Sequence, residues 1–146
     1  MFLLDTNVVS ELRRVRPDPG VLAWIKGVDN AALFVSAVTI GGIQAGIELT
    51  RDQDPAKAEE IEAWLDLLAS SYEVLAMNAA AFREWARLMH RRSDTLYEDA
   101  MIAATARVRG LTVVTRNVAD YRALGSIVLN PFSREPVLRK APPKAP

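Results

Sequence analysis

The sequence predicts an α/β fold in which a mostly parallel central sheet is flanked by helices. Short, wholly apolar runs, such as FLL at 2–4 and LTVV at 111–114, are typical of strands buried on both faces. Segments with helical periodicity separate these runs, and strands that alternate with helices usually pair in parallel. With 146 residues, half of them hydrophobic, the chain is long enough for one such domain.

Helix-capping residues place the elements of the first half. Asp5 or Thr6 caps a helix directly after the first strand, and Asp54 caps a long amphipathic one with Pro55 in its first turn. The helix expected between these two, at 38–49, contains three glycines, Gly41, Gly42 and Gly46. Each glycine within a helix costs about 0.5–1 kcal/mol relative to alanine. We expect strands at 2–4 and 32–38, and helices at 5–14, 21–27, 38–49 and 54–71.

The second half continues the alternation. Asn78 caps a helix, and Gly110 ends another that begins near residue 98. We expect a short strand or an extended link at 72–77, and strands at 111–115 and 126–130 with a short helix between them. One domain then covers residues 1–132. Residues 133–146 hold four of the eight prolines and are predicted to form an extended, mobile tail.

Composition excludes several classes of function. The chain has no cysteine, so disulfides and thiolate zinc sites are absent, and its single histidine, at a helix end, gives no nucleophilic triad. Lysine plus arginine equal aspartate plus glutamate at 18 each, which argues against a general polyanion binder. No apolar run approaches the roughly 18 residues of a membrane span, and no leader peptide is visible, so we expect a soluble cytoplasmic protein without membrane contact.

Polar residues gather where the predicted strands end. Asp5 follows the first strand, Asn117 and Asp120 follow the strand at 111–115, and Asp99 lies in the first turn of the helix before it. The carboxyl ends of parallel strands form one edge of a sheet, so these groups are expected to converge. Clustered carboxylates repel one another, and a hard cation such as Mg²⁺ or Mn²⁺ relieves that repulsion. Two such ions can activate water against a phosphodiester.

Each of these residues also has an ordinary structural interpretation. Asp5 can be a helix cap, Asp99 can favour the dipole of its helix, and Asn117 and Asp120 can be turn residues. Taken singly, none of them establishes a catalytic site.

Three segments together carry a more specific signal: LLDTNVVSEL at 3–12, EDAMIAATARVRGLTVVTRNVADY at 98–121 and LNPF at 129–132. In combination they resemble the PIN-domain ribonucleases, and most of all the VapC and FitB type toxins of bacterial type II toxin–antitoxin pairs. The resemblance implies a PIN-like fold and a Mg²⁺-dependent endoribonuclease that cleaves RNA. It also implies a protein antitoxin as inhibitory partner, and a homodimer.

The resemblance assigns roles to several positions. The first metal-binding aspartate of the family falls on Asp5, and the one that opens the late helix falls on Asp99. Thr6 and Asn7 complete the first motif and would orient Asp5 or a bound water. The fourth polar position of the family falls on Asn117, with Asp120 one turn onward, although many relatives carry an acid where Asn117 stands.

One family ligand is missing. The resemblance places a glutamate in the helix after the second strand, in a pattern like TIGEI, and here the matching residues are TIGGI, so the acid position falls on Gly42. Glu48 is the next acid along, but six residues at about 100° each point it away from the face of Gly42.

The sequence leaves three functions open. The first is a metal-dependent endoribonuclease weakened by Gly42, and the second is a catalytically silent module that only binds an antitoxin. An α/β phosphatase with Asp5 as nucleophile ranks below both, because such enzymes usually carry a second aspartate two residues on, where Asn7 stands.

Overall fold

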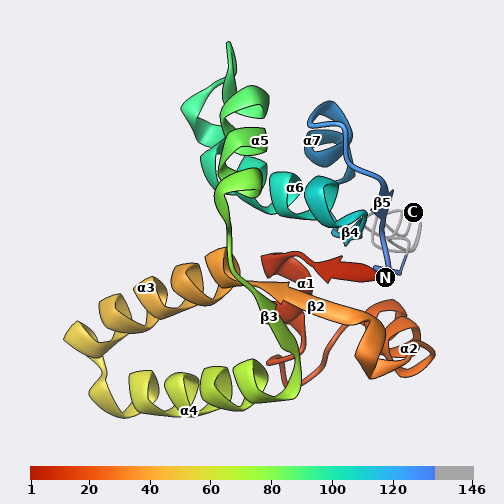
Figure 1. Ribbon diagram of the computed structural model, residues 1–146. Helices are drawn as coiled ribbons and strands as arrows, with labels where there is room; N and C mark the ends of the chain where they lie inside the picture. The colour runs from red at the N-terminus through yellow and green to blue at the C-terminus, as the bar shows by residue number, and fades with distance from the viewer. Residues whose placement is uncertain (134–146) are drawn as a thin grey trace, which may run out of the picture.

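A five-stranded, wholly parallel sheet forms the centre of the computed structural model, which describes residues 1–133 (Figure 1). The predicted α/β class with a parallel central sheet is therefore confirmed. The predicted tail lies outside the described residues, except for Ser133. The strands are β1 (Phe2–Leu4), β2 (Leu33–Ser36), β3 (Glu73–Leu75), β4 (Thr112–Val114) and β5 (Val128–Leu129).

The order of the strands creates a switch point at β1. The sheet runs β3-β2-β1-β4-β5, so the chain first adds strands on one side of β1 and then returns to build the other side. Leu4, the last residue of β1, pairs with Val35 of β2 and Val114 of β4. Residues that follow β1 and β4 therefore meet at the carboxyl edge, where open parallel sheets usually carry their ligands.

Helices cover both faces of this sheet (Figure 1). Successive residues of β1 point to opposite faces, so that Leu3 joins one buried apolar cluster and Leu4 the other. On the Leu4 face lie α1 (Thr6–Glu11), α2 (Pro19–Lys26), α3 (Ala37–Gln53) and α4 (Pro55–Ser71). On the Leu3 face lie α5 (Ala79–Met89), α6 (Tyr97–Arg109) and α7 (Val118–Ala123). Two short 3₁₀ helices, η1 (Asn30–Ala32) and η2 (Asp94–Leu96), complete the described chain.

The predicted caps are confirmed where the structure describes them. The side chain of Asp5 accepts a hydrogen bond at the start of α1, that of Asp54 does so at the start of α4, and that of Asn78 at the start of α5. Gly110 ends α6 with a φ of +67°, a left-handed conformation that glycine adopts at little cost.

Several predicted elements differ in length from those of the structure. The segments expected at 72–77 and 126–130 form shorter strands, at Glu73–Leu75 and Val128–Leu129, and the helix expected at 38–49 is longer, at Ala37–Gln53. The strand expected at 32–38 ends at Ser36, because the Ser36 hydroxyl accepts a hydrogen bond from the Val38 amide (3.0 Å) and so begins α3. The helix expected at 5–14 ends at Glu11, which leaves Arg13 and Arg14 in the turn that follows.

Helices α3 and α4 form a long hairpin that projects from the sheet (Figure 1). Ile47 of α3 and Leu68 of α4 are both buried in the apolar cluster on the Leu4 face. Among residues 1–133, no helix is both long enough and apolar enough to cross a membrane.

Candidate functional site

Asp5 lies at the switch point of the sheet. It follows β1 directly, and its amide donates a hydrogen bond to the carbonyl of Val114 in β4 (2.9 Å). Its side chain is buried, with 4% of the residue exposed. A carboxylate in such a place needs hydrogen-bond donors around it, because burial of an unpaired charge is costly.

Four donors surround the Asp5 carboxylate. Its Oδ1 accepts hydrogen bonds from the Thr6 amide (2.8 Å) and the Tyr121 hydroxyl (3.0 Å). Its Oδ2 accepts from the Thr115 hydroxyl (2.8 Å) and from Nδ2 of Asn7 (3.2 Å). Two carboxylate oxygens offer about four lone-pair positions, so the hydrogen-bonding capacity of Asp5 is filled.

A second set of contacts fixes the turn after β4 against the turn after β1. The Thr115 hydroxyl accepts hydrogen bonds from the Asn117 amide (2.9 Å) and from Nδ2 of Asn7 (3.3 Å). The Arg116 amide donates to Oδ1 of Asn7 (3.3 Å). Asn7 and Thr115 both donate to Oδ2 of Asp5, and the orienting role expected for Asn7 stays a prediction.

Thr6 contributes through its backbone and through a contact with α3. Its amide donates to Oδ1 of Asp5, which caps α1, and its hydroxyl lies 3.0 Å from the hydroxyl of Thr39. Thr39 is buried, so this pair joins the start of α1 to the first turn of α3. No direct contact between the Thr6 hydroxyl and Asp5 is found.

Asp99 approaches Asp5 from the first turn of α6. The Tyr121 hydroxyl, which donates to Asp5, also lies 3.4 Å from Oδ1 of Asp99. Partial burial raises the pKa of Asp99, the negative charge of Asp5 raises it further, and Asp120 and Glu98 add to the effect, while the hydrogen bond from Tyr121 opposes it. The structure thus brings Asp5 and Asp99 to one hydroxyl group and places Asp120 and Glu98 within electrostatic range.

Tyr121 is the residue that sequence reasoning missed. It lies in α7, is wholly buried, and burial together with the charges of Asp5 and Asp99 raises the pKa of its hydroxyl. The group therefore stays a neutral donor. The available signal was the short helix after β4, in which Tyr121 follows Asn117 by about one turn and so returns to the same side.

Asn117 and Asp120 differ in what they contribute. Asn117 begins α7, but its exposed side chain makes no capping hydrogen bond, and only its amide joins the network through Thr115. Asp120 lies in the first turn of α7 and acts on Asp99 through its charge. Of these two candidates, Asp120 is the one whose side chain acts on the carboxylate pair.

Gly42 is not required by the backbone or by packing. It lies within α3 without a positive φ, and a Cβ built there would meet only Oε2 of Glu98, at 4.0 Å, an ordinary contact distance. Gly42 and Gly46 line a groove of about 350 Å³ beside α1, with Thr6 at one side and Trp64 of α4 at another. Position 42 therefore has room for a side chain and faces the acidic first turn of α6.

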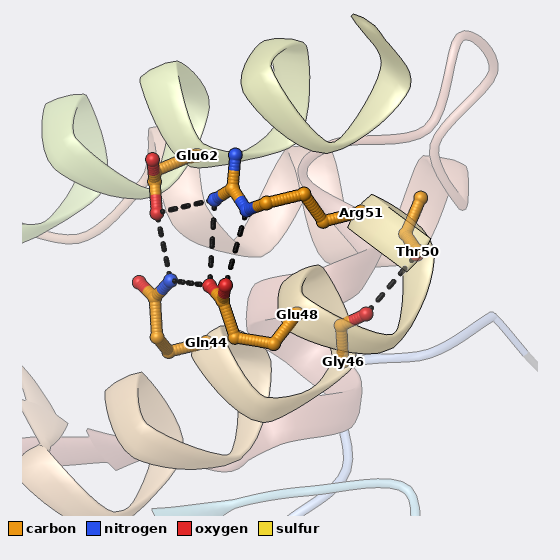
Figure 2. Close-up of polar contacts among 6 residues, drawn as sticks. All are labelled: Gln44, Gly46, Glu48, Thr50, Arg51 and Glu62. Atoms are coloured by element: carbon orange, nitrogen blue, oxygen red, sulfur yellow. Dashed lines mark hydrogen bonds and ion pairs between the residues drawn. The ribbon is translucent and has the colours of Figure 1, made fainter. Parts of the chain in front are cut away.

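Glu48, the next acid after Gly42, is bonded to residues of the α3–α4 hairpin (Figure 2). It receives hydrogen bonds from Arg51 (3.0 Å) and Gln44 (2.7 Å), and these lower its pKa. Gln44 and Arg51 also donate to Glu62 of α4, at 2.7 and 3.0 Å. Figure 2 shows that these four side chains tie α3 to α4, so Glu48 is engaged within the hairpin.

The donor set fits a hydrated ion better than a protein cage. Mg²⁺ keeps several waters and is commonly bound through one or two carboxylates, which Asp5 and Asp99 supply. Within residues 1–133, no group of three or more His, Cys, Asp or Glu side chains is arranged to hold a metal ion. The arrangement thus fits a Mg²⁺ or Mn²⁺ ion held by two carboxylates and water.

The chain is similar to known proteins in sequence and in fold. The family model described as PIN domain matches residues 2–123. A protein of Sinorhizobium fredii named VapC ribonuclease Y4jK is 34% identical over 143 residues, covering 90% of this chain and 98% of its own length. Toxin FitB of Neisseria gonorrhoeae is 32% identical over 139 residues, covering 90% of this chain and 99% of its own length. The crystal structure of FitAcB from the same organism superposes with a TM-score of 0.78 at 27% identity, covering 90% of this chain and 98% of that one.

Proposed function

The chain belongs to the PIN-domain family, and we propose that it is the toxin of a type II toxin–antitoxin pair. In this proposal it is a Mg²⁺-dependent endoribonuclease that cleaves RNA phosphodiesters, and Gly42 weakens it. The observation that carries the proposal is the meeting of Asp5 and Asp99 at one hydroxyl group beside the switch point of the sheet. Its partners are an antitoxin protein, an RNA substrate and a second copy of the chain.

Each residue of the site has a distinct task. Asp5 and Asp99 hold the cation, with Mn²⁺ as an acceptable substitute for Mg²⁺. When bound, the ion supplies Lewis-acid activation for hydrolysis of a phosphodiester. Thr115 and Asn7 keep Oδ2 of Asp5 in a fixed direction. Asp120 and Glu98 add negative charge around Asp99, which favours a bound cation.

Gly42 explains why the activity is expected to be weak. A carboxylate at this position would extend toward Glu98 and the first turn of α6, which also carries Asp99. Without it, the cation has fewer protein ligands and the hydrolytic water is less well placed. Misplacement of a reacting group can cost on the order of 10²-fold in rate.

A catalytically silent module that only binds an antitoxin is the second candidate. It is favoured by the full set of donors around Asp5, which satisfies this carboxylate without a cation. The two functions differ in what a restored carboxylate at position 42 would do.

Cleavage of a mixed RNA pool with Mg²⁺ tests the proposal. We expect Gly42→Glu to raise the cleavage rate by up to about 100-fold and to make expression toxic. Gly41→Glu is the matched control, because Gly41 neighbours Gly42 in α3 and a Cβ there meets nothing within 4 Å. It adds the same charge to the same helix on a different side, and it should leave the rate unchanged.

Thermal unfolding separates the outcomes. If Gly42→Glu folds but shows neither faster cleavage nor added stabilisation by Mg²⁺, the nuclease proposal is wrong and the silent antitoxin-binding module takes its place. Without Mg²⁺, we expect this variant to be less stable than its helix propensity predicts, because the new carboxylate lies near that of Glu98.

A further inference from the structure

One hydroxyl group lies against both carboxylates of the site. The Tyr121 oxygen is 3.0 Å from Oδ1 of Asp5 and 3.4 Å from Oδ1 of Asp99, the second contact being the longer and weaker. We propose that Tyr121 is a positioning residue whose hydroxyl competes with the divalent cation for Asp5 and Asp99. This inference rests on the proposed function, since it concerns the same carboxylate pair.

The hydroxyl oxygen cannot move out of the way. Tyr121 has no exposed surface, and its ring is part of the apolar cluster that includes Val113 and Leu124. A close-packed ring of this kind does not swing to another position without disturbing the core. Only the O–H bond can rotate. A cation that binds Oδ1 of Asp5 and Oδ1 of Asp99 must therefore break the hydrogen bonds from Tyr121 while the phenol oxygen stays where it is.

The other three donors to Asp5 leave Tyr121 as the competing one. The Thr6 amide belongs to the backbone at the start of α1, where Asp5 is the cap. Thr115 and Asn7 both bond to Oδ2 and also to each other. Among the donors to Asp5 within residues 1–133, Tyr121 is the one that also hydrogen-bonds to Asp99, so its hydroxyl lies between the two carboxylates.

One hydroxyl proton stabilises the pair less completely than a cation would. A phenol donates a single proton, so it cannot make a strong hydrogen bond to both carboxylates at once. The hydroxyl lowers the repulsion between Asp5 and Asp99, so the free energy of Mg²⁺ binding becomes less favourable. Removing the hydroxyl should leave a less stable metal-free protein that binds the cation more tightly, by about tenfold or more.

Titration with Mn²⁺ and Mg²⁺ tests this expectation in Tyr121→Phe, which keeps the buried ring. Affinity is measured by calorimetry and by the shift in melting temperature. Tyr72→Phe is the control. This substitution also removes a half-buried tyrosine hydroxyl, but Tyr72 follows α4 and lies far from β4 and α7 in the sequence. We expect tighter binding and a larger metal-induced shift in Tyr121→Phe only. Equal or weaker binding in that variant overturns the inference.

A second measurement leaves Tyr121 in place. The chain has three tyrosines, so the double variant Tyr72→Phe and Tyr97→Phe retains Tyr121 alone. Ultraviolet resonance Raman bands of tyrosine report whether the phenol donates a hydrogen bond. We expect these bands to change on saturation with Mg²⁺ or Mn²⁺. If calorimetry shows bound metal and the tyrosine bands stay unchanged, the proposed competition between Tyr121 and the cation is wrong.

The outcomes separate this inference from the proposed function. Tighter metal binding in Tyr121→Phe without RNA cleavage by any variant supports the competition and counts against the nuclease. Cleavage that depends on Mg²⁺, with equal metal affinities in the two proteins, supports the nuclease and overturns the competition. No metal binding by wild type, by Tyr121→Phe or by Gly42→Glu overturns both.

Discussion

The site disfavours ionisation of the Asp99 carboxylate. Partial burial and the charge of Asp5, followed by those of Asp120 and Glu98, raise its pKa above the usual 3.8. The folded protein therefore binds the Asp99 proton more tightly than the unfolded chain does. The stability that this protonation contributes is fully present below the unfolded pKa and is lost as the pH rises through the raised folded pKa.

Comparison of the wild type with Asp99→Asn tests this dependence. In the absence of divalent cations, the free energy of unfolding of the wild type should fall relative to the variant as the pH rises from about 4 to about 7. Urea unfolding at each pH gives both curves. Asp18 and Glu48, whose pKa values are lowered, act in the opposite direction but are present in both proteins, so their effects cancel. Parallel curves would contradict the prediction.

At the scale of single elements, the glycines have opposite roles. Gly20 lies in the first turn of α2, and a Cβ there would stand 2.5 Å from the Pro131 carbonyl oxygen and 2.6 Å from the Ser133 amide. Ser133 is held beside it, because its amide and hydroxyl both donate to Asp18, at 2.9 and 2.6 Å. Gly46, in contrast, lies within α3 with nothing within 4 Å of a Cβ.

Alanine substitutions should therefore have opposite signs. Gly20→Ala forces backbone atoms apart, and we expect it to destabilise the protein by about 1–3 kcal/mol. Gly46→Ala is its control, and we expect a stabilisation of about 0.5–1 kcal/mol from the better helix propensity. Chemical denaturation measures both. A Gly20→Ala protein as stable as the wild type would show that the segment at 131–133 does not stay on α2.

Most elements could be predicted from local chemistry, whereas the contacts between elements could not. Asp54, Asn78 and Gly110 mark helix ends through bonds or backbone angles that involve only nearby residues, so their roles followed from the sequence. The end of β2 was misplaced because an apolar run does not reveal that Ser36 turns from pairing to capping.

The site was predictable only as far as strand order allows. Asp5 and the residues after β4 converge because parallel strands share a carboxyl edge, which the alternation of elements already implies. The contact of Tyr121 with Asp5 spans 116 positions and depends on how α7 packs on α6. The approach of Glu98 to Gly42 joins two helices on opposite faces of the sheet in the same way. Helix periodicity places Tyr121 on the side of Asn117, but it does not predict either of these contacts between distant elements.

At the scale of the whole molecule, the hairpin of α3 and α4 carries exposed apolar surface as well as core residues. It projects from the sheet (Figure 1), and its helices are joined by the polar contacts of Gln44, Arg51 and Glu62. Two large apolar side chains on it are exposed, Leu49 at 71% and Leu67 at 65%. Apolar surface on a projecting element is a feature of protein–protein interfaces.

Association with the proposed antitoxin should therefore protect this hairpin. We expect the protein encoded beside this chain to form a stable complex with it in size-exclusion chromatography with light scattering, and the free chain to be a dimer. Hydrogen exchange in α3 and α4 should slow on complex formation, because buried helix amides open less often. The amides of α5 serve as the internal control, since that helix lies on the other face of the sheet. A free monomer that ignores its co-encoded partner, or a complex with unchanged exchange in α3 and α4, would contradict this assignment.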